Sequence, residues 1–372
     1  MYVKKSNQNM IIFVLISILG VLFIKSVNLD ASETSCKSLM AFSGLVSYSP
    51  ESKLDIYLMN PNENLNVVRI TNDDGNYKLL GWSPDGIQLG LINTGNDIDG
   101  EGGGIPVTYN RVTNQILEMD LGSNNLEVFS FNWSPDGSRM LLLAKNNDSS
   151  SEEITYFLME SNNPATLENL VAYWTEDIIR VRWSPDGNTI AFESRDEQNQ
   201  DVEIFLLSIE ERNMHPTQLT NNEWNDSLGN WSHDGSQISF ISDEYGNYDI
   251  YTLSLSTNTI TRLTDNTLLE SNPVWSYDDK YIAFRRDFNN LVILDMNSLI
   301  EQEIDTITPD LAYELVESSW LPNKNALSIR EAQYETNPSE IYIYDLESSE
   351  VRTISQELPT KIIMAHNWSP CF

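Results

Sequence analysis

The chain alternates short apolar segments with polar turns along almost its whole length. Apolar segments such as Ile190–Phe192, Ile238–Phe240 and Ile282–Phe284 each follow, within three residues, a turn that contains Gly, Asn, Asp or Ser. Short apolar runs between such turn-forming residues favour β-strands. No stretch beyond the N-terminal segment keeps a helical period, so the pattern predicts an all-β protein.

A longer period groups these strands into units. The pentapeptide Trp-Ser-Pro-Asp-Gly occurs unaltered at 82–86, 133–137 and 183–187. In this sequence Pro presets φ, Asp hydrogen-bonds to the local backbone and Gly adopts the left-handed conformation, which predicts a tight turn. Successive tryptophans of the repeat are 44 to 51 residues apart, and altered copies begin at Trp231, Trp275, Trp320 and Trp368.

Each unit holds further strand signals after this turn. An apolar second strand is followed by a third strand rich in Ile and Tyr, such as Asp249–Thr252, and a fourth often ends in Leu-Thr, as at Leu263-Thr264. Four short strands per unit are typical of a propeller blade. Seven units predict a seven-bladed β-propeller, with six or eight blades as alternatives.

The two ends of the chain carry complementary parts of one unit. Leu39–Ser43 matches the second strand of a unit, whereas Trp368 ends a first strand. We therefore predict that the C-terminal strand joins the N-terminal strands in one shared closing blade, which removes open sheet edges.

The two cysteines fall at this predicted closure point. Aligning Met40 with Ile190 gives Cys36 the repeat position that Cys371 holds three residues after Trp368. An exported protein with its only two cysteines at one site is expected to form a disulfide there. A pair of free buried thiols is the alternative.

The combined pattern of Trp-Ser-Pro-Asp-Gly, Ile-Ala-Phe, Asp-Ile-Tyr and Leu-Thr resembles the repeat of TolB-like propellers. The resemblance covers residues 39–370. TolB itself combines a six-bladed propeller with a separate N-terminal domain. This sequence differs in having seven units and no room for a second domain, so the resemblance implies the propeller fold and not the particular role of TolB.

The N-terminal segment predicts export. Residues 11–24 form an uninterrupted apolar run that follows Lys4 and Lys5. Spanning a bilayer takes about 20 apolar residues, so this shorter run matches a signal-peptide core. Because no clean cleavage site follows, residues 1–31 are predicted to be either a signal peptide or an uncleaved membrane anchor. The propeller, residues 32–372, should lie outside the cytoplasm.

The charge balance limits the classes of partner. The chain has 55 acidic and 22 basic residues, which give a formal net charge of −33. Such a surface repels phosphate backbones and anionic lipid head groups, so nucleic acid is excluded and membrane association is expected only through the N-terminal segment. Basic peptides, cations and neutral sugars remain as partners, although the acidity also serves solubility. We expect a monomer.

Catalytic motifs are absent from the sequence. The three histidines, His215, His233 and His366, share no metal-ligand spacing. Neither a Gly-x-Ser-x-Gly elbow nor a phosphate-binding glycine loop is present. The sequence therefore predicts a protein that is not an enzyme and has no cofactor.

An insertion at residues 93–105 is the one candidate for a cation site. Asp97, Asp99 and Glu101 alternate ahead of three consecutive glycines, and calcium favours such oxygen ligands. The EF-hand pattern fails because Thr108 stands where the bidentate Glu is required. A flexible acidic loop without a bound ion is the alternative.

Two tryptophans lie outside the repeat and are candidates for binding. Trp174, next to Tyr173, and Trp224 each precede a repeat tryptophan, in loops predicted on the face opposite the Trp-Ser-Pro-Asp-Gly turns. Exposed aromatics on an acidic rim anchor a basic peptide or stack on a sugar. In the alternative, both indoles fold over their own blades. The same loops carry Asp73, Asp74, Glu176, Asp177, Glu223, Asp226, Asp265, Glu270, Asp310 and Glu314.

These features together predict an exported, non-catalytic propeller that serves as a protein- or peptide-binding platform. Two alternatives stay open at this point. One is a carbohydrate-binding or carbohydrate-active propeller, and the other is a structural domain stabilised by a cation.

Overall fold

The computed structural model describes thirteen segments of the chain: residues 39–45, 52–60, 67–97, 102–148, 153–170, 178–195, 201–210, 216–287, 290–304, 314–322, 324–332, 340–354 and 362–370. They belong to one compact unit, Lys37–Phe372. The predicted signal peptide or anchor lies outside these segments. No helix in the described segments is long and apolar enough to cross a membrane.

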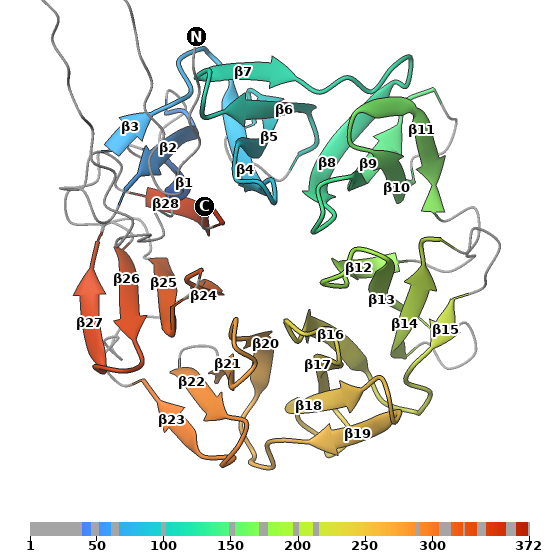
Figure 1. Ribbon diagram of the computed structural model, residues 1–372, viewed down its shortest axis with the longest axis vertical. Helices are drawn as coiled ribbons and strands as arrows, with labels where there is room; N and C mark the ends of the chain where they lie inside the picture. Colours follow the sequence, from blue (N-terminus) through green and yellow to red (C-terminus); the bar gives the residue numbers. More distant parts are fainter. Residues whose placement is uncertain are drawn as a thin grey trace, which may run out of the picture. The chain divides into compact units, whose positions relative to one another are not determined.

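The described residues form 28 strands in seven four-stranded antiparallel sheets, which surround a common centre as the blades of a β-propeller (Figure 1). From the centre outward, blade 1 contains β28 (Ile362–Trp368), β1 (Met40–Leu45), β2 (Asp55–Met59) and β3 (Val67–Arg69). Blade 2 contains β4 (Asn76–Trp82), β5 (Gln88–Gly95), β6 (Ile105–Asn110) and β7 (Gln115–Glu118). Blade 3 contains β8 (Leu126–Trp133), β9 (Arg139–Asn146), β10 (Ile154–Glu160) and β11 (Asn163–Asn169).

The other four blades repeat this order. Blade 4 contains β12 (Ile178–Trp183), β13 (Thr189–Arg195), β14 (Val202–Ser208) and β15 (Thr217–Gln218). Blade 5 contains β16 (Asp226–Trp231), β17 (Gln237–Ser242), β18 (Asp249–Ser254) and β19 (Thr259–Arg262). Blade 6 contains β20 (Glu270–Trp275), β21 (Tyr281–Arg286), β22 (Asn290–Asp295) and β23 (Glu301–Glu303). Blade 7 contains β24 (Glu314–Trp320), β25 (Ala326–Ala332), β26 (Glu340–Asp345) and β27 (Glu350–Thr353).

The predicted shared blade is confirmed. Strand β28 pairs with β1, and Trp368 lies opposite Met40 just as Trp183 lies opposite Ile190 in blade 4. The seven-bladed count is confirmed as well, which excludes the alternatives of six or eight blades. Both cysteines lie outside the described residues, so the disulfide between Cys36 and Cys371 stays a prediction.

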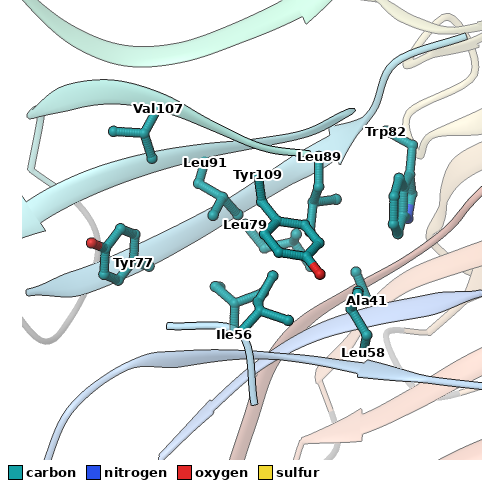
Figure 2. Packing of buried hydrophobic residues seen from close by; sticks show 11 residues of the cluster. Ala41, Ile56, Leu58, Tyr77, Leu79, Trp82, Leu89, Leu91, Val107 and Tyr109 are labelled. Carbon is teal, nitrogen blue, oxygen red and sulfur yellow. The ribbon is translucent and has the colours of Figure 1, made fainter. Parts of the chain in front are cut away.

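Apolar contacts between neighbouring blades hold the ring together. Seven buried clusters each combine residues of two adjacent blades, and the seven together run once around the ring. Figure 2 shows the cluster in which Ala41, Ile56 and Leu58 of blade 1 face Leu89 and Tyr109 of blade 2. Because both faces of every sheet are covered in this way, the central strands are apolar on both sides and show little alternation.

The Trp-Ser-Pro-Asp-Gly turn forms as predicted. In blade 4 the hydroxyl of Ser184 donates to Asp186 Oδ1 at 2.5 Å and accepts the amide of Thr189 at 3.0 Å. Gly187 has a φ of 70°, in the left-handed region. The same serine–aspartate hydrogen bond recurs at Ser83, Ser134, Ser232 and Ser276.

Neighbouring turns also contact one another across the blade boundary. A Cβ added to Gly235 of blade 5 would lie 3.6 Å from Pro185 of blade 4. At the next boundary both positions have changed, because blade 5 has His233 in place of Pro and blade 6 has Asp279 in place of Gly. The amides of His233 and Asp234 donate to the Asp279 carboxylate at 2.5 and 2.9 Å. Proline has no N–H, so the change to histidine adds a donor for which Asp279 supplies the acceptor.

We predict that His233 and Asp279 are energetically coupled. Asp279→Asn keeps a residue that tolerates the positive φ of 56° but provides only one acceptor oxygen, so the free energy of unfolding should fall by about 1 kcal/mol. In a His233→Pro background the loss should be smaller, because one donor is already gone. Urea denaturation of the four proteins of this double-mutant cycle measures the coupling. Equal losses in both backgrounds would show that the two residues act independently.

A β-bulge interrupts each of the seven innermost strands where it pairs with the second strand of its blade. In a regular strand, residues five positions apart point to opposite faces. The bulge in β16 lies between Leu228 and Trp231, and Asp226 and Trp231 are both buried against blade 4. The bulge therefore turns the first side chain of an innermost strand into the blade interior.

Candidate functional site

Three segments of blades 4 to 6 lie together on the face opposite the Trp-Ser-Pro-Asp-Gly turns, which we call the loop face. They are the loop between β15 and β16, the turn between β17 and β18, and the loop between β19 and β20. The backbone of Asn225 in the first loop and its side-chain amide both donate to the Asp243 carboxylate in the turn, at 2.8 Å each. The side chain of Asn247, in the same turn, donates to the carbonyl of Leu268 in the second loop at 3.0 Å. These bonds fix the three segments side by side.

Exposed apolar side chains follow these segments. Trp224 has 41% of its surface exposed and Tyr245 has 61%, and Leu268 and Leu269, in the loop between β19 and β20, are exposed as well. The guanidinium of Arg262 lies 4.0 Å from the centre of the Tyr245 ring, a cation–π contact. We call these four exposed side chains the apolar strip. The acidic side chains Glu223, Glu244, Asp265 and Asp287 are exposed in or next to the same segments.

The predicted binding residues divide into three groups. Trp224 and Glu223 are exposed on the loop face. Tyr173, Trp174, Glu176 and Asp177 lie outside the described residues. Asp226 is buried, so it does not belong to the exposed acidic rim, and Glu270 is buried in the same position of the next blade. The bulges described above turn these two carboxylates inward.

The insertion at residues 93–105 shows a structural use for its acidic and glycine residues. Asp97 Oδ2 accepts the amide of Gly102 at 2.7 Å, while Asp99 and Glu101 lie outside the described residues. A Cβ on Gly104 would lie 2.2 Å from the Asn93 carbonyl oxygen, so only glycine fits this close approach. Throughout the described segments, no three His, Cys, Asp or Glu side chains could together hold a metal ion.

Below the loop face, two carboxylates approach one another between blades 4 and 5. The backbone amide of Asn222 donates to Glu203 Oε1, and its side-chain amide donates to Asp226 Oδ2, both at 2.7 Å. Both acids are 1% exposed. Burial raises the pKa of Glu203 to about 7 and also raises the pKa of Asp226. Nothing in the sequence pattern alone distinguishes these acids from the exposed ones around them.

The centre of the ring contains a cavity of about 770 Å³ between β12, β16 and β20. Arg180, Arg182 and Arg285 line it, although the chain as a whole is strongly acidic. Arg180 Nη1 donates to the Leu228 carbonyl at 2.7 Å, and its Nε lies 3.9 Å from a Glu193 carboxylate oxygen. The signal for this basic wall was present in the sequence as two arginines at alternate positions directly before a repeat tryptophan.

The family of the chain follows from the repeats. Residues 120–329, more than half of the chain, match the sequence profile of the TolB beta propeller domain. The chain belongs to this family. No curated protein sequence matches it significantly.

Solved structures similar to this TolB-like propeller include enzymes. A puromycin-hydrolysing peptidase from Mycobacterium tuberculosis has a TM-score of 0.61 and 11% identity over 87% of this chain, and this chain spans 54% of its length. An oligogalacturonate lyase from Vibrio parahaemolyticus has a TM-score of 0.59 and 12% identity, covering 86% of this chain and 93% of the lyase. Putative TolB from Agrobacterium tumefaciens has a TM-score of 0.46 and 17% identity, and the alignment covers 86% of this chain and 89% of the TolB chain. At these identities the similarity shows the fold alone.

The raised pKa of Glu203 gives this TolB-like propeller a defined pH dependence. A carboxyl group with a higher pKa in the folded state adds stability below its usual pKa of 4.5, and this stability is lost as the pH rises through about 7. In buffer with EDTA, the free energy of unfolding should therefore fall between about pH 4.5 and pH 7, and Glu203→Gln should remove most of this slope. Urea denaturation across that range measures it. An unchanged slope in the variant would assign the pH dependence to other groups.

Proposed function

We propose that this chain is a non-catalytic, extracytoplasmic propeller that binds a protein segment on its loop face. The observation that carries the proposal is the apolar strip of Trp224, Tyr245, Leu268 and Leu269 between exposed acidic side chains. Large aromatic side chains contribute most of the binding energy in many protein interfaces. Neighbouring carboxylates favour a partner that places Lys or Arg beside its apolar residues.

The rigidity of the backbone under the strip supports a binding role. The Trp224 amide donates to Asn222 Oδ1 at 2.7 Å, and hydrogen bonds to Asp243 and from Asn247 join this loop to its neighbours. A surface that is already ordered loses little conformational entropy on association, so more of the contact energy is available for affinity.

Sequence features support the non-catalytic and extracytoplasmic parts of the proposal. The sequence has no serine-nucleophile elbow and no histidine spacing for a metal. The apolar run at residues 11–24 after two lysines directs the propeller out of the cytoplasm. The net charge of −33 favours basic partners over nucleic acid.

We predict that the full chain, purified in mild detergent, selects peptides with apolar and basic residues from a random display library. The affinity of a selected peptide should fall about tenfold or more on Trp224→Ala, because the indole loses its contact area. Raising the salt concentration should also weaken binding, since it screens the carboxylates. Isothermal titration calorimetry measures both effects.

The matched control is Val112→Ala, because Val112 is also an exposed apolar residue but lies in the turn between β6 and β7, on the opposite face. It should leave the affinity unchanged. A library that yields no peptide, or selected peptides that bind Trp224→Ala and the unmodified chain equally, would contradict the proposed site. Binding of neutral sugars lost on Trp224→Ala would favour the carbohydrate-binding alternative.

A further inference from the structure

A buried aspartate paired with an arginine recurs in two blades at equivalent positions. In blade 5, Asp249 opens β18 and lies 2.6 Å from Arg262 Nη2. In blade 1, Asp55 opens β2 and lies 2.8 Å from Arg69 Nη2. The strand registers make these pairs equivalent, because Tyr251 pairs with Arg262 and Tyr57 with Arg69. Each of these two blades thus supplies its own cation for the buried acid.

Blade 4 keeps the acid and lacks the cation. Glu203, the second residue of β14, lies in the same register. Phe205 pairs with Gln218, so Gln218 occupies the position of the two arginines. The threonine that follows is retained, since the amide of Ile204 donates to Thr220 Oγ1 at 2.9 Å as the amide of Ile250 does to Thr264. The local structure is therefore unchanged, and only the positive charge is missing.

A second buried acid, Asp226 of blade 5, also lacks the arginine that its equivalent in blade 6 has. Glu270 at the start of β20 lies 2.6 Å from Arg286, its partner residue on β21. Asp226 at the start of β16 pairs with Ser242 in the same register. Asp226 therefore faces Glu203 across Asn222 without the arginine that balances Glu270.

A third acid lies two residues before Glu203. Asp201 occupies the position of Lys53 in blade 1 and Asn247 in blade 5, so here too a positive or neutral residue has become acidic. Asp201 is 7% exposed. Among the residues that the structure describes, neither Asp201 oxygen, nor Glu203 Oε2, nor Asp226 Oδ1 has a hydrogen-bond partner. Buried carboxylate oxygens without partners are costly, and each of the three acids has at least one.

We propose that a divalent cation such as Ca²⁺ binds between Glu203 and Asp226 and replaces the arginines of the other blades. The free oxygens of these two carboxylates supply the charged ligands, and Asp201 adds its negative charge nearby. Calcium accepts six to eight oxygen ligands, including water, so two carboxylates and water suit it. The ion joins blade 4 to blade 5 directly beneath the loop that carries Trp224. This site is independent of the proposed peptide binding.

The test is thermal unfolding of the full chain after EDTA treatment, with Ca²⁺ or Mg²⁺ then added. Calcium should raise the Tm by a few °C, and the rise should saturate with concentration, because the ion binds only the folded state. Glu203→Gln should abolish the rise. Gln218→Arg restores the arginine of blades 1 and 5, so it should raise the Tm in EDTA and make the protein insensitive to calcium.

Two further variants locate the effect. Glu223→Gln removes an exposed acid of the same loop and should leave the calcium response intact. Asp97→Asn tests the insertion at residues 93–105 and should also leave it intact. The proposal is overturned if neither cation raises the Tm, or if the rise persists in Gln218→Arg. It is also overturned if the response is lost in Asp97→Asn and kept in Glu203→Gln.

Discussion

The structure depends on burying both faces of every blade. Each four-stranded sheet is apolar on both sides, so it is stable only between two neighbours, and the seven inter-blade clusters meet this need only when the ring is complete. The ring is completed in blade 1, where the C-terminal strand β28 pairs with the N-terminal strand β1. The pairing leaves neither strand as a free edge inside the ring, and an open array of the same blades would expose a large apolar face at each end.

This constraint also decides where polar chemistry can lie. Because the blade faces are occupied by apolar packing, side chains that must reach solvent lie on the loop face, on the turn face or in the central cavity. Acids that do fall between blades, such as Asp249 and Glu270, are held by arginines from within the same blades. Buried ion pairs of this kind add little net stability but are strongly destabilising when one partner is missing. At the junction of blades 4 and 5, Glu203 and Asp226 lack the arginines that occupy the equivalent positions beside Asp249 and Glu270.

The sequence predicted the number of blades, the tight turns and the closing strand, because each follows from a repeated local pattern. The burial of Asp226 could not be predicted from the sequence. The bulge between Leu228 and Trp231, which follows Asp226 in the same strand, changes the direction of its side chain and leaves no signal in the residue types. The sequence also does not show that Gln218 stands where other blades have an arginine. Only the strand registers align it with Arg69 and Arg262. The basic wall of the cavity does not follow from the composition, because its arginines are few in a chain with a net charge of −33.

The contact between His233 and Asp279 has a consequence for how such repeats diverge. A turn that loses its proline gains an amide donor, and the acceptor comes from the glycine position of the following blade. The two substitutions therefore belong to different repeats, although they form one structural change. At this contact, the residues that must change together belong to the boundary between two blades and not to a single repeat. A consensus averaged over repeats would erase this correlation and predict proline and glycine at both positions.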